Sequence, residues 1–388
     1  MFLGTDLLRD HDALEASRPF ARPAVAEARA RKLQESASRF FRGTAALFYR
    51  LAATHPEALQ LARGQSPRWV VGDVHLENIG ALTLDGEHYT YDLNDLDEAA
   101  HAAGAWDVLR GAVACVIAVQ DLGAGFDAAV GALHAFARAY KDQVPFKAPR
   151  SARDLVALSR KERLENLLRA RTQGRGDKRR FRRWSRYLGL AAGEGAMLRA
   201  LLERWALGAR EPGLTLLDAR FRVQGTGSLG VHRYALLVGD REDRAFLLDA
   251  KEMHPSALVT AGLARPPRGR DLAPLPDALR VLTAEAALRG HAVPGVQALS
   301  GTDGRSYLVR RYAPGEFKLD LERVLRERPE ELQGLAATLG HRLREAHRRA
   351  GHEPSRMDEA RVRSIALDLG SHMVRAWQEL RARSLETM

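Results

Sequence analysis

The sequence predicts a two-lobed α+β protein, and three observations support this fold class. With 388 residues, the chain is long enough for two lobes or domains. Both ends carry apolar residues at helical spacing, whereas 216–320 carries short apolar runs between Gly-rich turns, as strands do. A hydrophobic content of 45% and a charged content of 28% are those of an ordinary soluble globular protein.

The first 150 residues are expected to be mainly helical, with one hairpin. Apolar residues recur at helical spacing until His55-Pro56 ends the run. The hairpin is predicted from Asp85-Gly86, a strong two-residue turn between two strand-like runs. The expected elements are a helical stretch at 24–54, strands at 68–71, 79–84 and 88–91, and helices at 104–122 and 126–140.

The rest of the chain is expected to pass from helices to strands and back to helices. The expected elements are two or three basic helices across 154–208, strands at 221–224, 231–238, 245–250 and 307–312, and helices at 278–289, 329–349 and 358–385. The chain is therefore divided into a first helical part at 1–150, a helical insertion at 151–215, a β-rich lobe at 216–320 and C-terminal helices at 321–388.

Composition excludes several classes of protein. A single cysteine, Cys115, excludes intrachain disulfides and metal sites built from several thiolates. No apolar run approaches the roughly 20 residues of a membrane span. The first nine residues lack the basic and apolar regions of a signal peptide. We therefore expect a cytoplasmic protein without a membrane partner.

The segment Gly72-Asp73-Val74-His75-Leu76-Glu77-Asn78 carries the strongest functional signal. It places an Asp and an Asn five residues apart, and Asp92 follows after the predicted hairpin, which would return it beside Asn78. Kinase-like enzymes use this arrangement: the first Asp accepts the proton of the attacking hydroxyl, and the Asn and later Asp hold Mg²⁺ on ATP. The pattern predicts Asp73 as the catalytic residue and Asn78 and Asp92 as metal ligands, with Asp95 as a possible second carboxylate.

A second nucleotide signature is Gly225-Thr226-Gly227-Ser228-Leu229-Gly230. A strand rather than a helix follows this turn, which favours the phosphate-covering loop of kinases over a dinucleotide fingerprint. Such a loop is followed by a phosphate-binding Lys, and Lys251 ends the third strand. The residues predicted to bind the nucleotide are Gly225, Gly227, Ser228, Gly230 and Lys251, with Glu285 as the acidic partner of Lys251.

These motifs, together with Phe41-Arg42-Gly43, resemble the bacterial domain of unknown function family numbered 2252, which is grouped with the protein-kinase-like superfamily. The resemblance spans roughly residues 25 to 350. The catalytic segment is similar to that of aminoglycoside and choline phosphotransferases, which implies the roles given above for Asp73, Asn78 and Asp92. Gly104-Ala105-Trp106-Asp107 resembles the stretch after their metal-binding Asp. The resemblance implies that Asp107 braces the catalytic loop through backbone hydrogen bonds.

The order of the motifs is the reverse of that in ordinary kinases, because the Gly-rich turn follows the catalytic segment by about 150 residues. A circular permutation explains this order: residues 1–150 and the last helices would form the C-lobe, and 216–320 the N-lobe. Such a rearrangement is physically easy where the termini lie close together.

The expected function is an ATP- and Mg²⁺-dependent phosphotransferase that acts on a hydroxyl of a small molecule. Two alternatives remain: a nucleotide-binding pseudokinase or regulatory module, and a nucleic-acid-binding protein. The last rests on a net charge of +11 and on a basic cluster at 178–186 with Phe181 and Trp184 interleaved. That cluster is also compatible with a solvated helix face or with a site for an anionic substrate.

Three further residues have expected roles outside the catalytic set. His75 is expected to form structural hydrogen bonds. Arg42 is expected to contact a phosphate or the acidic segment at 92–98, or to form a structural salt bridge. His347 lies in a charged stretch, Arg342 to His347, and is expected to be exposed.

Overall fold

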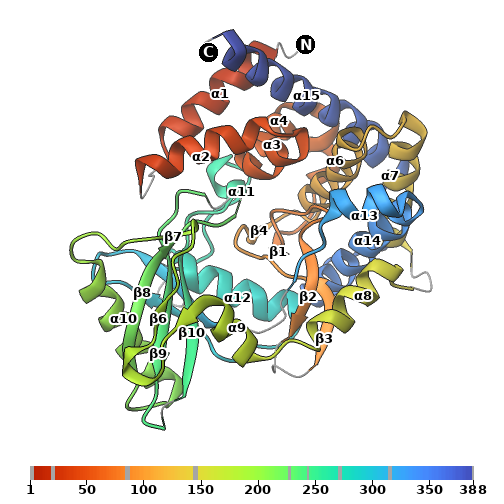
Figure 1. Cartoon of the computed structure of the whole chain (residues 1–388). Coiled ribbons are helices and arrows are strands. Elements are labelled where there is room, and N and C mark those ends of the chain that lie inside the picture. Colours follow the sequence, from red (N-terminus) through yellow and green to blue (C-terminus); the bar gives the residue numbers. More distant parts are fainter. Residues whose placement is uncertain are drawn as a thin grey trace.

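The computed structural model describes residues 4–18, 22–83, 88–142, 147–225, 229–242, 244–269, 273–312 and 317–386. Helices from both ends of the chain form one part, and a β-rich segment from the middle forms the other (Figure 1). This arrangement confirms the α+β class. Among the described residues, no helix is long and apolar enough to cross a membrane.

The helical part is built around one buried helix, α6. Every residue from Ala105 to Val119 of this helix is buried, and all of them are uncharged except Asp107 and Arg110. Helices α7, α14 and α15 pack against it. The helices of this part are α1 (Gly4–Ala16), α2 (Pro23–Gln34), α3 (Ala37–Gly43), α4 (Ala45–Thr54), α5 (Pro56–Ala62), α6 (Ala105–Asp121), α7 (Phe126–Lys141), α8 (Arg150–Ser159), α13 (Leu321–Glu327), α14 (Leu332–Arg349) and α15 (Glu359–Glu386).

The helical stretch expected at 24–54 is divided into three helices. The side chain of Ser36 accepts a hydrogen bond from the Arg39 backbone and begins α3, while Thr44 leaves helical geometry before α4. His55-Pro56 ends the run as predicted and also begins α5, because Pro suits the first turn of a helix and the His55 ring accepts from the Ala58 backbone.

The β-rich part is an antiparallel six-stranded sheet in the order β11-β12-β10-β9-β8-β7. Its strands are β7 (Tyr187–Leu188), β8 (Thr215–Arg222), β9 (Arg233–Gly239), β10 (Ala245–Glu252), β11 (Val296–Ser300) and β12 (Ser306–Arg311). Its helices are α9 (Leu164–Arg171), α10 (Glu194–Ala209) and α12 (Asp277–Arg289). The short helix α11 (Ala257–Thr260) follows β10 and packs against α4 of the helical part.

Side chains alternate across the two faces of this sheet. Leu236 and Leu248 pack in one cluster with Trp205 of α10, whereas Leu237 and Leu247 pack in another with Leu168 of α9. Because successive strand residues point to opposite faces, Lys251 shares the face of Leu247. The sheet therefore presents Lys251 on the side away from α10.

Three small sheets complete the fold: β1 (Arg68–Val70) with β4 (Ala100–Ala102), β2 (Ile79–Thr83) with β3 (Tyr89–Leu93), and β5 (Thr172–Gln173) with β6 (Arg180–Phe181). The pairing of β2 with β3 confirms the predicted hairpin strands. The predicted turn at Asp85-Gly86 lies outside the described residues.

The basic cluster at 178–186 is not on a helix, so its interpretation as a helix face was wrong. Helix α9 ends at Arg171, and Gly174 and Gly176 adopt positive φ, which breaks the helix. The segment continues as a 3₁₀ turn at Gly176–Lys178 and the short strands β6 and β7. Helices α1, α5, α11 and α13 and strands β4 and β11 were not predicted, and β5, β6 and β7 lie where helices were expected.

Candidate active site

A cavity of about 380 Å³ lies between the helical part and the sheet. It is lined by the loops after β1 and β3, by the start of α4, by the end of β10 and by the segment after it. Its charged lining includes Arg42, Asp73, Asp95, Asp97, Glu98, Lys251 and Lys318.

Asp107 of α6 holds the loop that carries Asp73 through hydrogen bonds to the loop backbone. The backbone N–H groups of Val71 and Gly72 donate to its carboxylate at 2.6 and 2.8 Å. This is the brace that the family resemblance implied. Gly72 has a φ of +81°, and a Cβ there would lie 1.9 Å from the Glu98 carbonyl oxygen, so only glycine fits at this position.

A buried polar chain supports Asp107 in turn. Nε2 of His347 lies 2.9 Å from a carboxylate oxygen of Asp107, and its Nδ1 lies 2.8 Å from the Tyr140 hydroxyl. His347 has 0% exposure, so the expectation that it is exposed was wrong. Its charged neighbours in sequence obscured that it continues the buried face of Leu339 and Leu343 at spacings of four.

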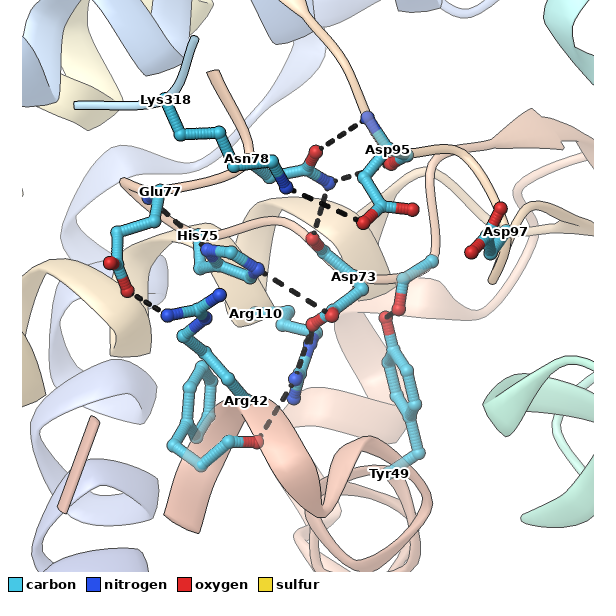
Figure 2. Close-up of polar contacts among 12 residues, drawn as sticks. Arg42, Tyr49, Asp73, His75, Glu77, Asn78, Asp95, Asp97, Arg110 and Lys318 are labelled. Carbon is cyan, nitrogen blue, oxygen red and sulfur yellow. Dashed lines mark hydrogen bonds and ion pairs between the residues drawn. The ribbon is translucent and has the colours of Figure 1, made fainter. Parts of the chain in front are cut away.

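Asp73 is held by a buried cation from α6 (Figure 2). Nε and Nη2 of Arg110 donate to Oδ1 of Asp73 at 2.8 and 2.5 Å, and Nε2 of His75 lies 3.6 Å from Oδ2. Burial raises the pKa of Asp73, but Arg110 and His75 outweigh it and hold the pKa well below its ordinary value. Asp73 is therefore ionised at neutral pH.

Asn78 ties the Asp73 loop to the acidic segment after β3 (Figure 2). Its amide nitrogen donates to the backbone carbonyls of Asp73 and Asp95, each at 2.8 Å, and its Oδ1 accepts from the Asp95 N–H at 2.9 Å. The side chain is fully buried and does not line the cavity. Asn78 was predicted to be a metal ligand, but its side chain instead holds two backbone segments together.

Asp92 also lies outside the cavity lining. It pairs with Gly80 inside the β2–β3 ladder. Burial lowers the pKa of His341 on α14, and Asp92 opposes this shift less than Glu345 does. The strand extends to Leu93, two residues beyond its predicted end, so the chain leaves the ladder only before Asp95. The structure therefore places Asp95 and Asp97, rather than Asp92, at the cavity.

Two lysines meet these carboxylates. Lys251 of β10 forms an ion pair with Asp97. Nζ of Lys318 lies 3.6 Å from Oδ2 of Asp95 (Figure 2). Burial raises the pKa of Asp95, but Lys318 and Lys251 lower it by more. Burial lowers the pKa of Lys251, although Asp95 acts in the opposite direction.

Glu285 is not the ion-pair partner of Lys251, which instead pairs with Asp97. It lies on α12 with 7% exposure, and burial raises its pKa against the effect of nearby Arg289 and Arg310. The concentration of acidic residues from Asp92 to Glu98 indicated that one of them would line the site. The sequence alone did not show that Asp97 would face the cavity.

The Gly-rich turn is described at its two ends. Gly225 and Gly230 have φ values of +102° and +109°, in the region that favours glycine. Gly225 lines the cavity, and its carbonyl accepts a hydrogen bond from Lys32 of α2 at 2.7 Å. The predicted residues Gly227 and Ser228 lie outside the described residues.

Arg42, at the end of α3, forms an ion pair with Glu77 and lines the cavity (Figure 2). This contact is the structural salt bridge, one of the alternatives expected for Arg42, and Glu77 lies outside the acidic segment at 92–98. Arg110 and Lys318 were not predicted, because an Arg inside an apolar helix and a Lys in a loop carry no motif of their own.

Fold and site together define an α+β protein with an acidic, lysine-containing cleft between a helical and a sheet part. A family model matches residues 21–186 and 144–381, so the chain belongs to the family described as an uncharacterized protein conserved in bacteria (DUF2252). Searches of curated proteins and of solved structures gave no match.

Proposed function

We propose that the chain is an ATP- and Mg²⁺-dependent phosphotransferase that moves the γ-phosphoryl group to a hydroxyl of a small molecule. The observation that carries the proposal is a convergence. Asp73 and Asp95 from the first motif and Gly225 and Lys251 from the second line one cavity, although more than 120 residues separate the two motifs. Phosphoryl transfer needs these groups together.

The proposed fold is a circularly permuted kinase-like one. The sheet with α12 takes the place of the N-lobe, and the helices around α6 take that of the C-lobe. Two features support this assignment: Lys251 lies on the sheet face that meets the catalytic loop, and α1 packs against α15, so both ends of the chain lie together (Figure 1).

Asp73 would orient the acceptor hydroxyl and receive its proton as the new bond forms. Its low pKa makes it a weak base before transfer, so its main contribution is positioning and charge. Arg110 keeps Oδ1 occupied and leaves Oδ2 beside His75, so the second oxygen is the one available to an acceptor.

Asp95 and Asp97 would hold the magnesium ion. Mg²⁺ is commonly bound through one or two carboxylates plus phosphate oxygens, and both side chains line the cavity. Among the described residues, no group of three or more His, Cys, Asp or Glu side chains is placed to hold a metal ion. The proposed metal would arrive bound to ATP and neutralise phosphate charge.

Lys251 and Lys318 would hold the phosphate oxygens. Each now faces a carboxylate, so phosphate binding would exchange one anionic partner for another within the same cavity. The peptide groups around Gly225 would contact the phosphates, since the positive φ at both ends of the turn lets the backbone approach closely.

Thermal unfolding with and without Mg·ATP tests nucleotide binding. At about 100 times its dissociation constant, the ligand should stabilise the wild type by roughly 2.7 kcal/mol. Lys251→Ala and Asp95→Asn should lose that shift. Asp92→Asn is the matched control, because it neutralises a carboxylate of the same segment outside the cavity. A shift lost in Asp92→Asn and kept in Asp95→Asn would return the metal role to Asp92.

Turnover separates an enzyme from a pseudokinase. ADP release should rise with one member of a panel of hydroxyl-bearing small molecules, and Asp73→Asn should abolish it while keeping the Mg·ATP shift. A wild type that binds Mg·ATP and phosphorylates no acceptor in the panel would favour the regulatory alternative.

A further inference from the structure

The positive charge of the chain is concentrated in one segment. Residues 160–186 contain twelve Lys or Arg and three Asp or Glu, so this stretch accounts for nine of the net +11 charges. We call residues 160–189 the basic arm. The rest of the molecule is close to electrically balanced, which makes this segment a localised cationic surface rather than part of an evenly basic protein.

The charges of the arm are not neutralised by the protein. Among the described residues, no carboxylate forms an ion pair with any of these twelve side chains. Several donate instead to backbone carbonyls: Arg180 to Asp177 at 2.6 Å, and Arg182 to Thr172 at 2.8 Å. Arg182, Arg183 and Arg186 are exposed. Structural ion pairing therefore does not explain this density of cations.

Aromatic side chains lie among these cations. The ring of Tyr187 lies edge-on to both Phe181 and Trp184, with centroid separations of 4.9 Å, and the Arg171 guanidinium lies 3.9 Å from the Trp184 ring centroid. Together with Arg182, Arg183, Ser185, Gly189 and Arg220, these three rings line an open depression of about 440 Å³. A depression of this kind can receive a planar aromatic base.

The sheet holds the arm in place. Phe181 and Leu168 are buried against Ala235, Leu237 and Leu247 on the face of the sheet opposite to α10. The Phe181 backbone N–H also donates to Asp218 of β8 at 2.8 Å. The cations and rings therefore stand on a fixed platform, which reduces the entropy that a ligand would have to remove on binding.

We propose that the basic arm binds single-stranded nucleic acid. Its exposed arginines would contact successive phosphates, and a base would stack in the depression lined by Phe181, Trp184 and Tyr187. Proteins that bind single strands combine these two features, a cationic track and aromatic stacking surfaces. The phosphotransferase proposed above is not required for this inference.

A membrane surface fits the arm less well. An element that lies on lipid presents large apolar side chains to the bilayer beside its cations. The exposed large hydrophobic residues of the described chain are Leu59, Phe126, Leu158, Leu207 and Leu279, and none belongs to the arm.

The arm ends beside the candidate active site. Burial lowers the pKa of Lys32 to about 8, with further lowering from nearby Arg39, Arg42 and Arg186. Lys32 donates to the carbonyl of Gly225, which lines the cleft. A strand bound along the arm would therefore pass close to the mouth of the cleft.

Fluorescence anisotropy tests the proposal. The protein is titrated into fluorescein-labelled single strands of DNA or RNA, 20 nucleotides long, at NaCl concentrations from 50 to 300 mM. We expect Arg182→Gln/Arg183→Gln/Arg186→Gln to weaken binding at least tenfold. The slope of log affinity against log salt should fall by about 2, because each lost phosphate contact on a single strand contributes about 0.7. Comparing DNA with RNA shows which sugar is preferred.

The matched control is Arg323→Gln/Arg326→Gln/Arg356→Gln. It removes the same net charge from exposed positions on α13 and the 3₁₀ turn at Pro354–Arg356, far from the arm in sequence. It should change the affinity less than about twofold. Equal weakening by the two triple variants would overturn the proposal, since binding would then follow net charge rather than the arm.

Stacking is tested separately at Trp184. Trp184→Ala should weaken binding at least fivefold, whereas Trp184→Phe should keep most of the affinity, because a single stacked base contributes measurably to such complexes. Circular dichroism checks that both variants are folded. No binding of either strand by the wild type at 50 mM NaCl would refute the inference, as would tight binding to phosphatidylglycerol vesicles without binding to the oligonucleotides.

Discussion

Asp73 owes its ionisation state to neighbours that are distant in sequence. Arg110 lies 37 residues further along the chain, is fully buried and stacks over the Phe41 ring at 4.2 Å. A buried carboxylate without such a partner would be neutral at physiological pH. The Asp73 motif was evident from the sequence, but its ion pair was not, because an Arg among apolar helix residues carries no pattern that assigns its partner.

Removing this cation tests the ion pair. We expect Arg110→Met to lower the free energy of unfolding at pH 7 by about 3 to 5 kcal/mol, because a buried carboxylate loses its partner. The double variant Asp73→Asn/Arg110→Met removes both charges and should recover part of the loss. Urea unfolding measures all of these variants. Equal losses for the single and double variants would contradict a favourable pair.

The same variant should change the pH dependence of stability. A carboxylate whose pKa is lower in the folded state stabilises the protein above its unfolded pKa, and this contribution is lost as the pH falls through the folded pKa. In the wild type, the contribution of Asp73 is therefore complete at pH 5 to 7. In Arg110→Met the burial effect dominates and raises the pKa of Asp73, so stability should increase as the pH falls within this range.

At the scale of elements, local sequence patterns predicted the secondary structure well, but they predicted the direction of individual side chains poorly. The β2–β3 hairpin follows from short-range spacing and the brace from Asp107 follows from the family resemblance, and the structure contains both. Asp92 was expected just after the end of the strand, but the strand extends to Leu93, so Asp92 lies inside it. The end of a strand is set by tertiary packing against α8 and α14, which a sequence pattern does not contain.

The junction of α14 with β1 offers an element-scale prediction. His352 follows α14, its ring lies 4.4 Å from that of His347, and its Nε2 lies 3.0 Å from the Trp69 carbonyl oxygen of β1. Burial and His347 lower the pKa of His352 to about 4. The unfolded chain takes up this proton near pH 6.5 and the folded chain does not, so stability should fall between pH 6.5 and 4.

His352→Gln removes this titration and keeps a side-chain N–H for the Trp69 carbonyl. We expect the variant to lose less stability than the wild type between pH 7 and 5, measured by urea unfolding at both values. His291→Gln, at an exposed position, is the control and should follow the wild type. A His352→Gln slope equal to that of the wild type would show that His352 does not titrate in this window.

At the scale of the whole molecule, one cleft is lined by segments from the first hundred residues, from the middle of the chain and by Lys318. The helical part contributes Asp73 and Asp95, and the sheet contributes Lys251. Sequence order predicted two lobes but not which surfaces face each other, because the Lys251–Asp97 contact spans 154 residues. Contacts of that length are fixed by the packing of whole elements, which a single sequence does not specify.

The proposed permutation makes a prediction about connectivity. Helices α1 and α15 pack together, and Figure 1 shows both ends of the chain on the same side of the helical part. We expect a variant with its ends joined by a Gly/Ser linker and its chain opened between Pro212 and Gly213, in an exposed turn before β8, to fold. It would carry the Gly-rich turn and Lys251 ahead of Asp73, which is the order of ordinary kinases.

The permuted variant should unfold cooperatively and keep the Mg·ATP thermal shift of the wild type. A control opened between Leu247 and Leu248, inside the buried central strand β10, should not fold, because it interrupts the sheet that presents Lys251. If the first variant is folded yet loses a shift that the wild type shows, the cleft depends on the natural connection before β8. The fold would then not behave as a circular permutation of a two-lobed kinase-like fold, and the kinase-like assignment would have to be withdrawn.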